Sequence, residues 1–143
     1  MTSSASTKQH GTNVASILVA RDYGIVPQAK LLTYRIALTS AGDTSGSDCR
    51  GELSLSKDDI SSLLNTAMND GAMIISLSLA GSSNSDSLKW AMARALSQGV
   101  IITAGAGNDA KEQTFGSFGH WSGVVGVSAI GTDGNRQDYS SWG

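Results

Sequence analysis

Apolar residues recur at helical spacing in two segments of the chain, and each segment predicts an amphipathic helix. In the first segment, Ser56 and Asp59 form a start resembling a capping box, and Gly71 ends the pattern. In the second, Ser85 can cap the helix and Gly99 ends it. The apolar stripe consists of Ile60, Leu63, Leu64, Ala67 and Met68 in the first helix, and of Leu88, Ala91, Met92, Ala95 and Leu96 in the second.

Short apolar runs next to these helices predict strands. Residues 73–79 lie between Gly71 and Gly81 and are almost wholly apolar, as expected for a strand covered on both faces. Residues 100–104 and 124–130 are further candidates for buried strands.

The first third of the chain has weaker patterns. Residues 1–9 are small and polar without periodicity, which predicts a disordered start or a severed loop. The apolar residues within 14–19 predict a short buried helix with His10 near its start. Residues 31–36 favour a strand, and the Gly/Ser/Asp-rich residues 39–51 predict a surface loop.

Strands and helices thus alternate, which is typical of an α/β domain with a parallel sheet. Because ligands gather at the carboxyl ends of parallel strands, residues 78–81 and 105–109 are the first places to look for chemistry. No internal repeat or second hydrophobic core argues for two domains.

Composition and charge narrow the classes of partner. Of the 143 residues, 40% are hydrophobic and 15% are charged, which is typical of a globular protein. The net charge is -2, and the acidic and basic residues are scattered along the chain. Nucleic acid and membrane surfaces are therefore not expected as partners, and no apolar run approaches the roughly 20 residues that span a bilayer. The lone Cys49 has no partner for an internal disulfide and no Cys or His neighbour at metal-ligand spacing, so we interpret it as a bystander.

Three segments, in this order, resemble the subtilisin family of serine proteases: His10-Gly11-Thr12-Asn13-Val14-Ala15, Ser76-Leu77-Ser78-Leu79-Ala80-Gly81 and Ala104-Gly105-Ala106-Gly107-Asn108-Asp109. Residues 24–31 are similar to the family's link between its histidine helix and the next strand. Residues 124–143 are similar to a later strand and its Ser-Ser-Trp-Gly turn. The resemblance covers essentially the whole chain from His10 onward, and it rests on the order of the segments rather than on any one of them.

The resemblance implies a three-layer subtilisin-like fold, with a mostly parallel sheet flanked by helices, of which residues 1–143 are an incomplete peptidase domain. It assigns His10 as general base and then general acid, because a serine hydroxyl is a poor nucleophile until an imidazole accepts its proton. It assigns Asn108 to the oxyanion hole, where a side-chain amide donates to the oxygen that becomes negative.

The resemblance also implies the segments that bind an extended peptide or protein substrate. Ser78, Leu79, Ala80 and Gly81, together with Gly107, would line the cleft, with small residues that let a peptide approach as an added strand. Gly51, Glu52 and Leu53 are candidates for the opposite wall. A strand end that simply runs into a tight turn would use the same residue types as residues 78–81.

The chain departs from the family pattern in several places. Asn13 stands where the family has a second His, Ser16 where it has Gly, and Ala80 where it typically has Gly. More importantly, no acidic residue precedes His10, and no serine lies in a Gly-Thr-Ser-Met or Gly-x-Ser-x-Gly setting. Without the triad aspartate and the nucleophilic serine, we expect the isolated chain to be inactive and to need the remainder of a peptidase domain as its partner.

Two alternative functions remain open at this point. The chain could be a degenerate, non-catalytic subtilase that grips an extended peptide without cutting it. It could also be a nucleotide-binding domain, since residues 105–110 satisfy G-x-G-x-x-G/A after a predicted strand, although the glycines and aromatic residues in 111–123 favour a loop over the helix that such a site needs.

The mechanism implied by the resemblance needs no cofactor or catalytic metal. The resemblance also allows a structural calcium ion, but no residues in the sequence identify a site for it. A secreted, extracellular address is implied by the family alone.

Overall fold

The computed structural model describes residues 10–34, 57–79, 81, 85–114 and 117–143. Contacts divide the chain into two compact units, residues 1–56 and residues 57–143. The predicted cap Ser56, Cys49, and the candidate wall Gly51, Glu52 and Leu53 lie outside the described residues.

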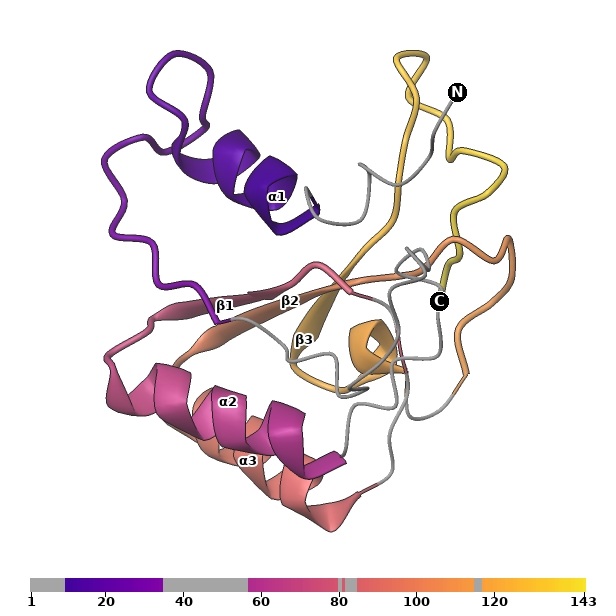
Figure 1. Cartoon of the computed structure of the whole chain (residues 1–143). Coiled ribbons are helices and arrows are strands. Elements are labelled where there is room, and N and C mark those ends of the chain that lie inside the picture. The colour runs from indigo at the N-terminus through magenta and orange to yellow at the C-terminus, as the bar shows by residue number, and fades with distance from the viewer. Residues whose placement is uncertain (1–9, 35–56, 80, 82–84, 115–116) are drawn as a thin grey trace, which may run out of the picture. The chain divides into compact units, whose positions relative to one another are not determined.

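The first unit contains helix α1 (His10–Val19), which begins at the candidate catalytic histidine (Figure 1). After the helix the chain turns back on itself: the amides of Ile25 and Val26 donate to the carbonyls of Ile17 and Leu18 at 3.0 and 2.8 Å. These bonds satisfy carbonyls that a helix end otherwise leaves without partners.

Two predictions for this unit are wrong in detail. The helix is present, but none of its residues is buried, and Ile17 is 57% exposed. Residues 31–34 form no strand, and residues 35–36 lie outside the described part of the chain. A strand needs a neighbour for its hydrogen bonds, and the described residues of this unit include none.

The second unit is an α/β arrangement built on a parallel sheet. Its elements are α2 (Lys57–Asn69), β1 (Ile74–Leu77), α3 (Asp86–Ser97), β2 (Ile101–Gly105), the short 3₁₀ helix η3 (Phe118–His120) and β3 (Val124–Val127). The three strands lie in the order β1-β2-β3 and all pair in parallel, with Leu77 opposite Ala104 and Gly105 opposite Val127. The alternation predicted for residues 57–130 is thus confirmed.

The hydrophobic core lies between the sheet and the helices α2 and α3, which lie on the same face of the sheet in Figure 1. Fully or nearly fully buried residues from helices and strands meet there: Leu64, Leu88, Met92, Ala95, Ile102 and Ala104. The expectation that residues 73–79 are covered on both faces is wrong for this structure. Met73 and Ile74 are 79% and 63% exposed.

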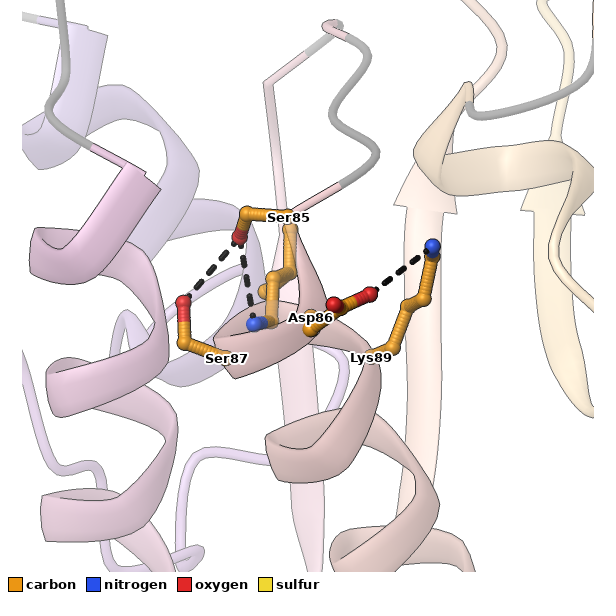
Figure 2. A network of polar contacts seen from close by, with 5 residues as sticks. Ser85, Asp86, Ser87 and Lys89 are labelled. Atoms are coloured by element: carbon orange, nitrogen blue, oxygen red, sulfur yellow. Dashed lines mark hydrogen bonds and ion pairs between the residues drawn. The ribbon is translucent and has the colours of Figure 1, made fainter.

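Polar contacts fix the start of α3 as its sequence predicts. Ser85 has extended backbone angles, and its Oγ accepts a hydrogen bond from the amide of Leu88 at 3.3 Å and lies 3.1 Å from Ser87 Oγ (Figure 2). Asp86 pairs with Lys89 at 3.2 Å one turn later. Farther along α3, Arg94 donates to Asn65 and Asn69 of α2 at 2.7 and 3.1 Å, which ties the two helices together.

Candidate active site

Asn108 lies in the loop that follows β2, at the carboxyl end of the sheet, and is exposed. The backbone on both sides of it has unusual dihedral angles. Gly107 has φ +99°, and Ala110 has φ +52°, a left-handed conformation that is costly for a residue with a Cβ. A loop of this shape persists only where surrounding contacts hold it.

Those contacts come from residues 139–142, near the end of the chain. Ser141 N donates to Gly107 O at 2.9 Å, and the amide of Asp109 donates to Ser141 Oγ at 3.2 Å. Ala110 N donates to Tyr139 O at 3.0 Å, and Trp142 N donates to Lys111 O at 3.1 Å. The loop is therefore bonded to one segment on both sides of Asn108.

Two buried hydroxyl groups belong to that segment. Ser140 and Ser141 are 1% and 2% exposed. Ser140 Oγ accepts a hydrogen bond from Ala129 N at 2.9 Å, while the carbonyl of Ser141 accepts one from Ser128 Oγ at 2.9 Å. The sequence marked this turn as similar to the family's, but it did not connect the turn to Asn108.

Gln113 also forms hydrogen bonds to this loop and to the segment that holds it. Its Nε2 donates to the carbonyl of Ala106, and its own amide donates to Trp142 O. Within the described residues its Oε1 is buried without a hydrogen-bond partner. A Cβ on Gly119 would lie only 2.9 Å from this oxygen, so the small residue there leaves room for the glutamine side chain.

The candidate peptide-binding residues follow β1, beside the Asn108 loop. A Cβ on Gly105 would lie 3.7 Å from Leu79 O, and β1 pairs with β2 up to Leu77. Ser78 and Gly81 are exposed, and Gly81 O accepts a hydrogen bond from Phe118 N at 3.0 Å. The structure thus brings residues 78, 79 and 81 to the same edge as Gly107 and Asn108, whereas Ala80 lies outside the described residues.

His10 belongs to the other unit, where it is the first residue of α1 and is exposed. A side chain at the first position of a helix projects from a rigid element, which suits a group that must hold and release a proton. Its assignment to one catalytic site with Asn108 stays a prediction.

The dinucleotide alternative is not supported by the geometry of the loop. Such a site needs a helix that opens at the glycines, so that its first amides meet the pyrophosphate. Residues 106–114 instead form bends, irregular backbone and an isolated bridge, and the next helical element, η3, has only three residues.

The described residues hold no group of three or more His, Cys, Asp or Glu side chains that could bind a metal ion. Across the same described ranges, every helix falls short of the length and apolar character needed to cross a bilayer.

Chemically, the loop presents an exposed side-chain amide on a firmly bonded backbone at the edge of a parallel sheet. A side-chain amide can donate a hydrogen bond to an oxygen that becomes negative during a reaction. Beside it, exposed backbone after β1 can pair with an extended peptide.

Comparison with known proteins gives consistent results. A model of the subtilase family matches residues 2–143. Subtilisin DY of Bacillus licheniformis is 29% identical over 142 residues, covering 94% of this chain and 47% of that protein. Subtilisin-like protease 1 of Trichophyton rubrum is 30% identical over 137 residues, covering 94% of this chain and 25% of that protein. The chain therefore spans less than half the length of these relatives.

Solved structures share the fold. The patellamide maturation protease PatA matches with a TM-score of 0.72 and 25% identity over 94% of this chain and 48% of that one. The prenylagaramide maturation protease PagA matches with a TM-score of 0.56 and 29% identity over 62% of this chain and 33% of that one. The predicted subtilisin-like α/β fold is confirmed, and with a family model matched along nearly all of its length, this chain belongs to the subtilase family of serine peptidases.

Proposed function

We propose that this chain is part of a subtilisin-like serine endopeptidase, in which His10 is the general base and Asn108 stabilises the oxyanion. The observation that carries the proposal is the loop after β2, where Asn108 is exposed between two backbone segments bonded to Ser141. A nucleophilic serine and a triad aspartate would come from the remainder of the peptidase domain, because these 143 residues contain neither in a family setting.

In the proposed reaction, His10 accepts the proton of the serine hydroxyl as it attacks the scissile carbonyl. It then returns a proton to the leaving amine. The aspartate would orient the imidazole and stabilise its charged form. His10 is the first residue of α1 and is exposed.

Asn108 would donate its side-chain amide to the carbonyl oxygen as that oxygen gains negative charge. The donor contributes to the rate because this hydrogen bond strengthens between ground state and transition state. The mechanism uses no cofactor. A structural calcium ion, allowed by the family resemblance, has no residues assigned to it in this proposal.

The substrate would be an extended peptide that pairs with the backbone of residues 78–81 and passes Gly107. Gly51, Glu52 and Leu53 stay the proposed opposite wall. Such pairing gives affinity through main-chain hydrogen bonds, and the neighbouring pockets give specificity. An extracellular address is part of the same proposal, on family resemblance alone.

The test uses the complete peptidase domain with single substitutions. His10→Ala should lower kcat by about a million-fold, and Asn108→Ala by about 10²–10³ with little change in KM; both magnitudes come from subtilisin, a member of this family. His120→Ala and Asn135→Ala are matched controls that should retain full activity, since both residues lie outside the proposed machinery. Full activity of Asn108→Ala would overturn the assignment.

The 143-residue chain alone should not hydrolyse peptides or react with a fluorophosphonate, because such reagents label only an activated serine. Covalent labelling of any serine in the purified chain would contradict this expectation.

The second candidate is a non-catalytic module that grips an extended peptide without cutting it. It is favoured by the position of β1, which is at one edge of the three described strands and leads directly into the exposed Ser78. An extended peptide titrated into the labelled chain should then shift the amide resonances of residues 78, 79 and 81. Such shifts, combined with no peptidase activity in any longer form of the protein, would favour the binding module over the enzyme.

A further inference from the structure

The hydrogen bonds around Asn108 converge on a single residue. Ser141 uses its backbone amide to hold Gly107 O, immediately before Asn108, at 2.9 Å. It uses its hydroxyl oxygen to accept from Asp109 N, immediately after Asn108, at 3.2 Å. Both peptide groups that flank Asn108 are thus attached to one buried serine.

Ser141 is itself held in place. It is 2% exposed, and its carbonyl accepts hydrogen bonds from Ser128 Oγ at 2.9 Å and Ser140 Oγ at 3.1 Å. A buried network in which the polar groups are bonded is rigid and defines one arrangement. The turn that follows β3 therefore holds Ser141 in place, and Ser141 in turn holds the Asn108 loop.

The loop needs such a restraint. Ala110 has φ +52°, and a non-glycine residue in this region persists only where its surroundings determine the backbone. Asn108 is exposed, so packing of its own side chain does little to fix its direction. The backbone on its two sides sets the direction of its Cα–Cβ bond, from which the side-chain amide projects.

We propose that Ser141 is a positioning residue for Asn108: its hydroxyl and its backbone amide together fix the backbone from which the oxyanion-stabilising amide projects. This inference rests on the proposed function of Asn108, and it extends that function to a residue that does not touch the substrate. An oxyanion donor is effective only if it is aimed before the reaction begins, which is the role assigned to Ser141.

The test compares three variants of the full 143-residue chain by nuclear magnetic resonance. Ser141→Ala removes the acceptor for Asp109 N, so amide exchange at Asp109 should accelerate at least tenfold, and the side-chain amide signals of Asn108 should shift and broaden. Ser140→Ala is the matched control: it also deletes a buried hydroxyl, but that hydroxyl accepts from Ala129 N. It should accelerate exchange at Ala129 and leave the Asn108 signals unchanged.

Ser141→Thr keeps the hydroxyl and should retain the Asp109 protection and the Asn108 signals of the unmodified chain. If the extra methyl group prevents folding, Ser141→Cys replaces it, because the thiol is close in size and a weaker acceptor. It should give changes between those of the unmodified chain and of Ser141→Ala. Unchanged Asn108 signals in a folded Ser141→Ala chain, or equal changes in Ser140→Ala, would overturn the inference.

The outcome is separable from that of the proposed function. If Asn108→Ala leaves kcat of the complete peptidase intact while Ser141→Ala disturbs the Asn108 signals, the oxyanion assignment fails and the structural coupling stands. If Asn108→Ala lowers kcat but Ser141→Ala leaves those signals unchanged, the positioning role alone is wrong. Where both are correct, Ser141→Ala in the peptidase lowers kcat with KM unchanged, and adding it to Asn108→Ala gives no further loss.

Discussion

The guanidinium group of Arg136 lies over the indole ring of Trp142, with 4.3 Å between its central carbon and the ring centroid. The same group donates from Nη1 to the carbonyls of Gln137, at 3.1 Å, and Ser140. Arg136 therefore closes the turn that carries both buried serines. A planar guanidinium can stack on the ring and donate in its own plane at once, which an ammonium group cannot do.

Arg136→Lys should for this reason destabilise the fold even though the charge is kept. A cation–π contact contributes about 0.5–1 kcal/mol at partly exposed sites, and a lost hydrogen bond about as much again, so we expect a loss of about 1–2 kcal/mol. Urea unfolding followed by tryptophan fluorescence measures it. Lys111→Arg is the control, because Lys111 forms an exposed ion pair with Asp109, and such a pair contributes little to the free energy of unfolding. Equal stability of Arg136→Lys and the unmodified chain would contradict the argument.

Gly24 is required by the turn after α1. A Cβ at this position would lie 2.5 Å from Ala20 N and 2.6 Å from Ala20 O, both backbone atoms that cannot move aside without disturbing the helix end. Gly24→Ala should cost about 1–3 kcal/mol and should accelerate hydrogen exchange at Ile25 and Val26, whose amides hold the turn.

Gly11→Ala is the matched substitution on the same helix. A Cβ there meets nothing within 4 Å, so the change should instead raise helix stability by up to about 1 kcal/mol. Circular dichroism at the helix band, recorded during thermal unfolding, distinguishes the two variants. If both glycines tolerate alanine equally, the close approach at Gly24 does not restrict the fold.

Ala110→Gly should stabilise the loop that carries Asn108. The left-handed backbone costs an alanine about 1–2 kcal/mol, while glycine loses about 0.4–1 kcal/mol more chain entropy on folding, which leaves a net gain of about 0.5–1 kcal/mol. Gly71→Ala is the reverse test and should lower stability. Gly71 has φ +83°, and a Cβ there meets nothing within 4 Å, so only the backbone conformation opposes the alanine. Urea midpoints at an unchanged slope measure both, and a loss of stability in Ala110→Gly would refute the strain argument.

The elements of residues 57–130 could be predicted because each has a local signal. Helical spacing and the Ser85 cap define α3, and short apolar runs define β1, β2 and β3. Which faces of β1 are covered could not be read in this way. Ile74 and Ile75 are adjacent and equally apolar, so their residue types do not distinguish the buried Ile75 from the exposed Ile74.

The candidate site likewise has one part that the sequence could predict and one part that it could not. Asn108 could be chosen from the sequence as a candidate, because it lies in the loop shortly after the β2 strand and within a recognisable segment. Its support by Ser141 could not, because the hydrogen bond from Asp109 N joins residues 32 positions apart and leaves no local pattern. For residues 31–34 the local pattern was misleading. Their residue types favour a strand, but they have no partner strand among the described residues and form none.

Asp133 gives the last prediction, which concerns pH. Its carboxylate accepts hydrogen bonds from Asn135 Nδ2 at 2.9 Å and from Asn135 N at 3.1 Å. Both bonds lower the pKa of Asp133 from its ordinary value of 3.8, and the side-chain bond has the larger effect. Because folding lowers the pKa of Asp133, its ionised carboxylate stabilises the turn at pH values above the ordinary pKa. This stabilisation is lost as the pH falls through the folded pKa. Asn135→Ala should raise the pKa of Asp133 toward its ordinary value, as followed by the carboxyl carbon resonance. Thr132→Ala is the control, since that side chain is not a donor to the carboxylate. An Asp133 titration that is the same in Asn135→Ala and in the unmodified chain would show that the side-chain bond is not what lowers the pKa.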